Sequence, residues 1–207
     1  MGRYTGPRNK IARRFGVNLG LKSNPTKVAR RLSQMPGVHG AKKRAGITST
    51  YGKQLNEKQK VKYIYGLRER QLRGYVNRAE GQKGNSAVTL QKLLERRMDN
   101  MIYRAGFAVT RAQARQLVNH GMFTVNGKKM DIPSYSVKVG DIIELKENKR
   151  KKKYFANIAD TLAKTEGPSW LALDAAKCQV KVTSEPEEKD FDKIFDIKII
   201  IEYYSSR

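Results

Sequence analysis

The stretch from Leu94 to Leu145 has the clearest order of secondary-structure signals in the chain, and it restricts the possible folds most. Its first apolar residues recur at helical spacing, and Gly106 follows as a left-handed helix end. Thr110 then opens a second helix, with Gln113 at the capping-box spacing. Asn126-Gly127 is the strongest short hairpin signal. The sequence therefore predicts two helices followed by an antiparallel hairpin.

The strands of the predicted sheet come from alternating or continuous apolar runs. Gly140-Asp141 turns the chain into a third strand, and Trp170 is predicted to lie in the core. The expected strands are residues 123–125, 130–132, 142–145, a strand-like region from 168 to 182, and a last strand in which Ile197, Ile199 and Ile201 alternate.

The helices and loops predicted outside Leu94–Leu145 rest on less regular patterns. Residues 1–54 are rich in glycine and proline and are expected to form an extended arm, with a short helix over 26–35 and a turn at 36–40. Residues 55–80 are expected to be helical, with Gly66 and Gly74 marking a break or a close helix contact. A linker over 81–86 and a short helix over 157–164 complete the prediction.

The charge of this chain is extreme and uneven. Its 207 residues have a net charge of +24, which indicates a polyanionic partner, either a nucleic acid or an anionic membrane surface. Residues 1–56 hold thirteen Lys or Arg and no acid, whereas residues 158–207 hold seven basic and ten acidic residues. The polyanion is therefore expected to contact the first three-quarters of the chain.

Several classes of protein and site are excluded or disfavoured. Cys178 is the only cysteine, so an intramolecular disulfide and a cysteine-rich metal site are impossible, and a reducing setting fits. No stretch has the length of a transmembrane helix, and no signal-peptide core follows the N-terminus. An Arg-rich start without acids also resembles an organellar transit peptide.

Together these signals predict an α+β fold. It combines a mostly helical N-terminal domain, which carries the basic arm, with a small α+β module of two helices packed on an antiparallel sheet. C-terminal strands are expected to extend that sheet. The predicted divisions are 1–54 (basic arm), 55–91 (helical domain), 92–157 (the α+β module, to which the family resemblance given next assigns RNA binding) and 158–207 (C-terminal helix and strands, packing back toward the helical domain).

Ordered motifs along the whole chain resemble one family, small-subunit ribosomal protein number four of the bacterial type. Gly2-Arg3-Tyr4 resembles its mature start, which argues against a transit peptide, and Pro36 to Gly40 resembles its Pro-Gly-Gln-His-Gly turn, with Val38 in place of glutamine. Further matches are Tyr51-Gly52, Glu57 to Val61, Tyr65 to Arg73, Met98-Asp99, Gly106, Thr110-Arg111, Ala114-Arg115 and Val125 to Gly127.

The resemblance implies a structural constituent of the small ribosomal subunit. It implies a primary rRNA-binding protein that nucleates assembly on the 5′ domain of 16S rRNA, beside the channel through which mRNA enters, in contact with ribosomal protein number five. The location would be the cytoplasm, with an organellar ribosome as the alternative. Many members carry zinc-binding cysteines in the arm, but Asn9, Ala12 and Lys27 stand in that region here, so neither zinc nor another cofactor is expected.

The predicted RNA contacts are basic residues, with a few aromatic ones for stacking on unpaired bases. Arg111 and Arg115 share one helix face at an end that favours phosphate, so reversing both charges is expected to weaken rRNA binding with little loss of fold. The full set is Arg3, Tyr4, Arg8, Arg13, Arg14, His39, Lys42, Lys43, Arg44, Tyr51, Lys53, Lys58, Lys62, Arg70, Arg73, Arg97, Arg104, Arg111, Arg115 and Lys128.

Two other functions are weaker alternatives. Pseudouridine synthases and other RNA-modifying enzymes carry the same module, and Arg97-Met98-Asp99 resembles the sequence around their catalytic aspartate. Asp99 is better explained as part of the module's own amphipathic helix, and no catalytic domain or nucleotide loop is left over, so no enzyme activity is expected. Peripheral membrane binding would require a long amphipathic helix with aromatic residues on its apolar face, which is not evident.

Overall fold

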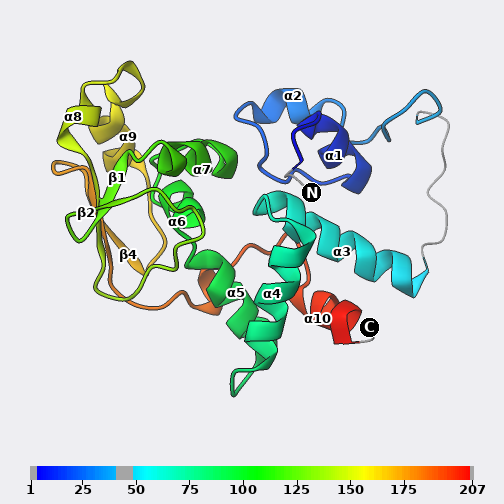
Figure 1. The fold of residues 1–207 in the computed structure, drawn as a ribbon. Coiled ribbons are helices and arrows are strands. Elements are labelled where there is room, and N and C mark those ends of the chain that lie inside the picture. The colour runs from blue at the N-terminus through cyan, green and yellow to red at the C-terminus, as the bar shows by residue number, and fades with distance from the viewer. Residues whose placement is uncertain (1–3, 41–48, 206–207) are drawn as a thin grey trace. The chain divides into compact units, whose positions relative to one another are not determined.

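The computed structural model describes residues 4–40 and 49–205, and these form two compact units (Figure 1). The helical unit comprises residues Met1–Leu90 and Asp192–Arg207, and the sheet unit comprises Gln91–Phe191. Helices and a five-stranded antiparallel sheet together confirm the predicted α+β class. In the described part of the chain, no helix is both long and apolar enough to cross a membrane.

The long helix predicted in the helical unit is two helices, α3 (Thr50–Ile64) and α4 (Glu69–Glu80). The break is at Gly66, whose φ of +61° is a left-handed conformation that glycine adopts without strain. Gly74 instead lies within α4 with open space where a side chain would be, so it marks neither a break nor a close contact. The predicted break is confirmed at the first of the two glycines only.

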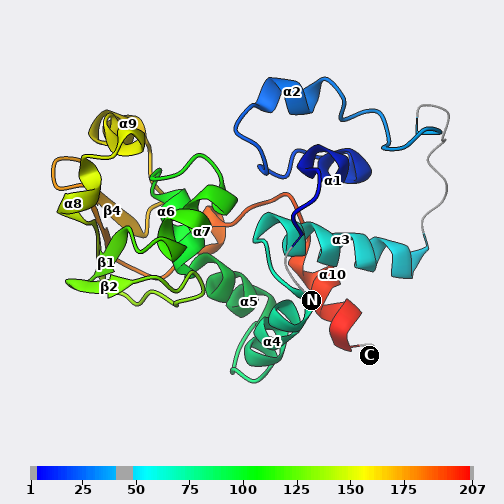
Figure 2. The ribbon, with the colours of Figure 1, turned by 45° about the horizontal axis from the view of Figure 1, so that its top comes forward.

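The last predicted strand is wrong, because residues Ile197–Ser205 form a helix, α10. Its buried residues are Ile197, Ile200 and Tyr203, which are three apart and therefore share a helix face. α10 packs along α3, as Figures 1 and 2 both show. The apolar surface of α3 selects the helical repeat over the strand-like alternation of the isoleucines.

The basic arm is more ordered than predicted. Arg8–Phe15 form α1, which the sequence analysis missed, and it ends at Gly16 with a φ of +66°. Ile11 is buried, and the ring of Phe15 lies 6.2 Å from that of Tyr63, so contact with α3 stabilises the segment.

The predicted helix over 26–35 is only the short α2, Pro25–Ala29, followed by turns. The predicted turn at 36–40 is confirmed by a hydrogen bond from the Gly40 N–H to the Gly37 carbonyl. Residues 41–48 of the predicted basic arm lie outside the described residues.

The first helix predicted for the module is also two, α5 (Ser86–Glu95) and α6 (Met98–Arg104). Arg97 between them is extended, with φ −70° and ψ 138°. The N–H groups of Met98 and Asp99 donate to the carbonyls of Tyr135 and Pro133, a later loop that the local pattern could not reveal. The loop carbonyls accept the free N–H groups at the start of α6, which therefore begins as a helix separate from α5.

The second predicted helix and the hairpin are confirmed. α7 is Arg111–Asn119, and strand β1 (Phe123–Val125) turns at Asn126-Gly127 into β2 (Lys128–Met130). The return strand was predicted two residues too late, because both turn residues have positive φ and the two-residue turn pairs Val125 directly with Lys128.

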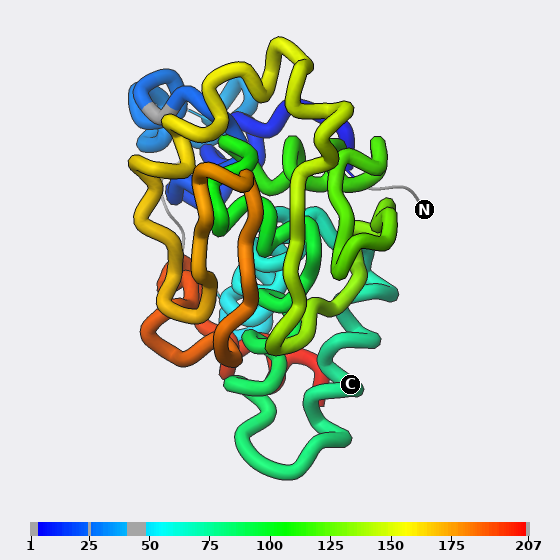
Figure 3. The backbone as a smooth tube through the Cα atoms, turned by 90° about the vertical axis from the view of Figure 1, so that its left-hand side faces the viewer, coloured from blue at the N-terminus to red at the C-terminus, as the bar shows by residue number. Residues whose placement is uncertain are grey.

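The sheet continues into the C-terminal part as predicted, except for the last predicted strand, which is the helix α10. Its order is β2-β1-β3-β5-β4, and all pairs are antiparallel. Figure 3 shows the later strands, in gold and orange, beside the earlier ones in green. The remaining elements are β3 (Ile142–Leu145), α8 (Glu147–Arg150), a 3₁₀ turn η1 (Lys153–Phe155), α9 (Ile158–Lys164), β4 (Leu171–Asp174), β5 (Gln179–Val182) and η2 (Glu188–Asp190).

One apolar core joins α6 and α7 to the sheet. Phe107 and Phe123 contact edge to face with ring centroids 5.4 Å apart, and Trp170 is fully buried, as predicted. Alternate residues of β1, β3 and β5 point into this core. The two helices are therefore fixed on the sheet with their polar faces turned from it.

Candidate nucleic-acid interface

The start of α7 is built as the sequence predicts. Gly106 has a φ of +83°, and the Phe107 N–H returns to the Ile102 carbonyl, which closes α6. Thr110 Oγ1 accepts the Gln113 N–H at 3.3 Å. The Gln113 side chain returns to the Val109 N–H, one residue before the predicted cap position. α7 therefore begins where predicted, and Arg111 and Arg115 share a face one turn apart.

Arg115 faces a buried ion pair. Arg97 donates from Nε and Nη2 to the two carboxylate oxygens of Asp99, at 3.0 and 2.7 Å. Arg115 Nη1 donates to the same carboxylate at 3.2 Å. Arg97 is only 1% exposed and Asp99 4%, so this pair is shielded from solvent. One acidic residue at the start of α6 thus holds two arginines.

A second buried carboxylate, that of Glu95, binds Arg104 directly and is linked to Arg111 through Asn100. Glu95 accepts from Arg104 Nε at 2.9 Å and Nη2 at 3.0 Å, and from Asn100 Nδ2 at 2.8 Å. Asn100 Oδ1 in turn accepts from Arg111 Nε at 2.7 Å. The Arg111 guanidinium also lies over the Tyr103 ring, 4.5 Å from its centroid.

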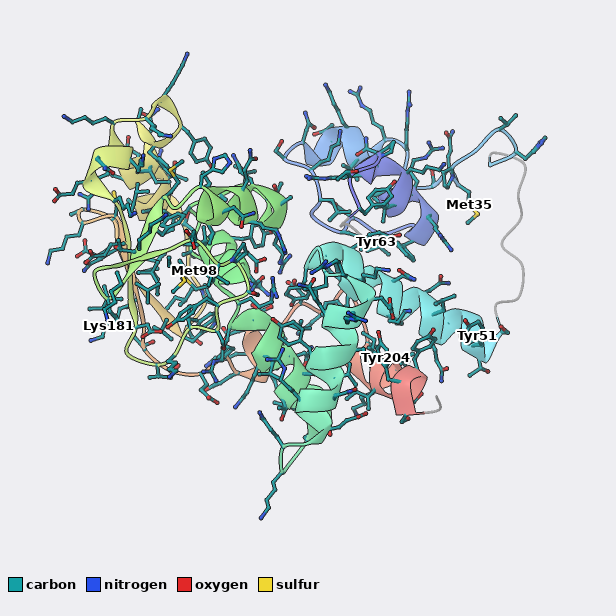
Figure 4. The ribbon with its side chains drawn as sticks, in the orientation of Figure 1. Met35, Tyr51, Tyr63, Met98, Lys181 and Tyr204 are labelled. Atoms are coloured by element: carbon teal, nitrogen blue, oxygen red, sulfur yellow. The ribbon has the colours of Figure 1, made fainter. Side chains whose placement is uncertain are left out.

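These contacts form one network, which we call the arginine cluster. It lies on the sheet unit around the start of α6, which is marked by Met98 in Figure 4. Four guanidinium groups meet two carboxylates, so the cluster has a surplus of two positive charges. Its members are Glu95, Arg97, Asp99, Asn100, Arg104, Arg111 and Arg115.

The cluster gives part of the predicted site a structural role. Arg97 is only 1% exposed and pairs with Asp99, so its place in the structure is that of a buried ion-pair partner. Asp99 lies in the first turn of α6, where it pairs with Arg97 and Arg115. Arg104 and Arg115 keep side-chain exposures of 19% and 20%, enough to meet a ligand at the surface.

In the helical unit, the carboxylate of Glu69 on α4 is likewise bonded by several side chains, and we call these contacts the Glu69 hub. Lys58 Nζ lies 2.8 Å and Lys62 Nζ 3.4 Å from its carboxylate, and the Tyr204 hydroxyl donates to it at 2.7 Å. Lys58 is 5% exposed and also lies over the Tyr203 ring, so within the helical unit it has a structural role. Tyr204 is labelled between α4 and α10 in Figure 4.

The hub changes the acidity of Glu69. Burial alone raises the pKa of this carboxyl, but hydrogen bonds from Lys58 and Tyr204 and the charges of Lys58 and Lys62 outweigh it, so the pKa lies below its ordinary 4.5. Burial and the bond to Glu69 raise the pKa of Tyr204, which therefore stays protonated as the donor.

We expect the hub to make stability depend on acid pH. A carboxyl whose pKa is lower in the folded state stabilises above its unfolded pKa, and this contribution is lost as pH falls through the folded pKa. Because the Glu69 side chain is 43% exposed, the contribution should be below about 1 kcal/mol. Urea unfolding between pH 7 and pH 3 should show Glu69→Gln less stable than the parent at neutral pH only. Glu80→Gln, exposed on the same helix, should match the parent at every pH, and a constant deficit for Glu69→Gln would contradict the assignment.

Two arginines of the arm act inside the helical unit. Arg13 donates to the carbonyls of Gln34 and Met35 at 2.9 and 3.0 Å, and Arg8 donates to the Leu21 carbonyl at 3.2 Å. These bonds tie the loops to α1. Both side chains therefore have a structural role beside the predicted contact with RNA.

The other predicted residues are spread over both units. Tyr4 packs edge to face on Tyr63, and Tyr51 stacks on Tyr203, although both are nearly half exposed. Arg3, Lys42, Lys43 and Arg44 lie outside the described residues. Some predicted residues are exposed and belong neither to the arginine cluster nor to the contacts of the Glu69 carboxylate, namely Arg14, His39, Lys53, Arg70, Arg73 and Lys128.

Glu95, Asn100 and Tyr103 hold the arginines in place, and none of the three was among the predicted site residues. Glu95 lies three residues before Met98 and seven before Ile102, on the apolar side of the helical pattern. A charged residue on a face expected to be buried requires a partner, so the position of Glu95 in the sequence already indicates a buried ion pair. Within residues 4–40 and 49–205, no group of three or more His, Cys, Asp or Glu could hold a metal ion.

Comparison with known families covers most of the chain. The profile of the ribosomal protein S4/S9 N-terminal domain matches residues 3–95, and that of the S4 domain matches residues 96–143. The boundary between the two falls at the break before α6, where the arginine cluster begins.

Individual proteins match the chain over its full length. A protein of Herpetosiphon aurantiacus is 49% identical over 99% of this chain and 100% of its own, and one of Chloroflexus aurantiacus is 44% identical over the same shares. A protein of Borrelia turicatae is 42% identical over 100% of both chains. Each of these relatives is named small ribosomal subunit protein uS4.

Proposed function

Because the chain belongs to the family of small ribosomal subunit protein uS4, we propose that it is a structural constituent of the small ribosomal subunit and binds 16S rRNA. The observation that carries this proposal is the match to relatives of that name over essentially the whole chain. The S4 domain profile, which matches residues 96–143 and so includes every member of the arginine cluster except Glu95, supports RNA as the direct ligand.

The physical properties of the chain support the same ligand. A net charge of +24 favours a polyanion, and two arginines of the cluster, Arg111 and Arg115, belong to α7, at whose start helix N–H groups also favour phosphate. Arginines held in fixed positions recognise the geometry of a folded backbone. We propose that the cluster reads the shape of RNA through its phosphates rather than through its bases.

Finer parts of the proposal rest on the family resemblance alone. They are nucleation of assembly on the 5′ domain of 16S rRNA, a position beside the entrance of the mRNA channel, and contact with ribosomal protein number five, in the cytoplasm. The predicted contacts outside the cluster, including Tyr4, His39, Tyr51 and Lys128, are proposed to extend the RNA-binding surface. The division of the chain into arm, helical domain, RNA-binding module and C-terminal part stays a prediction.

An RNA-modifying enzyme is not favoured. Relatives named as small ribosomal subunit proteins align with 99% of these 207 residues. Asp99, the one candidate for a catalytic aspartate, accepts hydrogen bonds from Arg97 and Arg115 and is only 4% exposed. A buried carboxylate held by two arginines is a structural ion pair in this setting.

Specific rRNA binding tests the proposal. We expect the purified chain to bind the 5′ domain of 16S rRNA at least about 10³-fold more tightly than an RNA of the same length and shuffled sequence, by analogy with specific protein–DNA complexes. Filter binding at fixed near-physiological salt measures both affinities. Equal affinity for the two RNAs would reduce the protein to a non-specific polycation and overturn the proposal.

A further inference from the structure

The arginine cluster contains a carboxylate that RNA binding alone does not explain. Glu95 is 1% exposed at the end of α5, within a surface proposed to meet a polyanion. A negative charge near phosphates opposes binding by Coulomb repulsion. Burying it also costs free energy unless its oxygens are fully bonded. Such a residue needs a compensating role.

The geometry shows what Glu95 does to Arg104. Both carboxylate oxygens are engaged by that one guanidinium, through Nε at 2.9 Å and Nη2 at 3.0 Å. A bidentate pair of this kind fixes the plane of the guanidinium as well as its position. The side chain of Arg104 nevertheless keeps 19% exposure. Its outer part is therefore displayed in one orientation.

Glu95 also reaches Arg111 through Asn100. Asn100 Nδ2 donates to Glu95 Oε2 at 2.8 Å and to the Glu95 carbonyl at 3.0 Å, so its Oδ1 must point the other way. Only an oxygen can accept the Arg111 Nε–H found there at 2.7 Å, and this settles the orientation of the amide. The Tyr103 ring supports the same guanidinium at 4.5 Å from its centroid.

We propose that Glu95 is a positioning residue, which presents Arg104 directly and Arg111 through Asn100 to the RNA backbone. The inference rests on the proposed function and assigns the buried acid a part in it. Long arginine side chains lose rotamer freedom when they bind, and a partner that orders them beforehand removes that cost. The gain from two ordered arginines exceeds the repulsion from one buried charge.

This proposal predicts an effect of opposite sign to simple electrostatics. Glu95→Gln removes a negative charge from an RNA-binding surface, yet we expect it to weaken binding to the 5′ domain of 16S rRNA about ten-fold. Glu185→Gln is the matched control, since Glu185 also lies in the sheet unit and pairs with Lys92 and Arg96, but outside the cluster. The control should bind as tightly as the parent or slightly more tightly.

A second pair of measurements separates positioning from loss of fold. Glu95→Asp keeps the charge but shortens the side chain, and it too should weaken binding at a temperature where circular dichroism shows the variant fully folded. In a background of Arg104→Gln with Arg111→Gln, Glu95→Gln should have no further effect on affinity. A structural role alone would instead give the same loss in both backgrounds.

The outcomes distinguish the inference from the function beneath it. If the parent fails to prefer the 5′ domain over shuffled RNA, the proposed function is wrong. If the parent shows that preference and folded Glu95→Gln binds equally or more tightly, the positioning role is overturned and the function stands. Losses that persist without Arg104 and Arg111 also overturn it.

Discussion

Replacing Arg97 with methionine is expected to lower the free energy of unfolding of the full chain by about 3 to 5 kcal/mol. The variant removes two hydrogen bonds to Asp99, at 3.0 and 2.7 Å, and leaves this 4%-exposed carboxylate with Arg115 as its charged partner and the Asn100 backbone N–H as a further donor. Methionine fills much of the space of the arginine stem, so the loss reports the ion pair more than a cavity. Urea unfolding followed by circular dichroism measures it.

The matched control makes the same change where no buried partner exists. Arg70 is exposed on α4, and Arg70→Met should change the stability by no more than about 0.5 kcal/mol. The double variant Arg97→Met with Asp99→Asn should recover part of the loss, because the uncompensated buried charge is then absent. If Arg97→Met proved as stable as the parent, the structural role of Arg97 would be overturned.

The local signals of the sheet unit could be read from the sequence because each depends on adjacent residues. Asn126-Gly127 supplies two positive-φ positions, and Thr110 supplies a side-chain cap for a helix start. Gly106 supplies the left-handed residue that ends α6. These features need no partner from elsewhere in the chain, and the structure confirms all three.

The features that sequence reasoning missed depend on distant partners. The break before α6 depends on the carbonyls of Pro133 and Tyr135, and the helix α10 forms on the apolar surface of α3. α1 forms although the basic arm was expected to be extended, because Ile11 is buried and Phe15 packs near Tyr63. Tertiary contacts decided each case against a reasonable local expectation.

The candidate site shows the same limit. Spacing correctly placed Arg111 and Arg115 on one face, but it could not show that Asn100 and Asp99 bind them. The double charge reversal is therefore no longer expected to spare the fold. Arg115→Glu would bring a second carboxylate to the place of a guanidinium 3.2 Å from the buried Asp99. Exposed lysines outside the cluster are better probes of RNA affinity.

Salt is expected to weaken rRNA binding very strongly. If the chain neutralises six or more phosphates, its affinity for the 5′ domain of 16S rRNA should fall by at least about 10³-fold between 50 and 200 mM KCl. The reason is the release of condensed counterions, which becomes less favourable as salt rises. Filter binding across the range gives the slope of log affinity against log salt. A nearly flat slope would exclude a phosphate-dominated interface.

The basic run after α8 provides a local test of the same interface. Lys151, Lys152 and Lys153 are exposed, and Tyr154 beside them donates to the Phe107 carbonyl at 3.1 Å, which ties the run to the loop before α7. Changing the three lysines to glutamine should make the slope shallower by about 2, since each neutralised phosphate contributes about 0.7 to 0.9.

A control with the same change of net charge shows whether location matters. Lys181, Lys189 and Lys198 are also exposed but belong to residues 158–207, where acids outnumber bases, and Lys181 is labelled on the sheet unit in Figure 4. Changing these three to glutamine also lowers the net charge of +24 by three. The slope should then stay at the parent value, because these lysines lie outside the proposed RNA-binding surface. Equal losses in the two triple variants would mean that total charge, and not the placement of cations along the chain, governs the affinity.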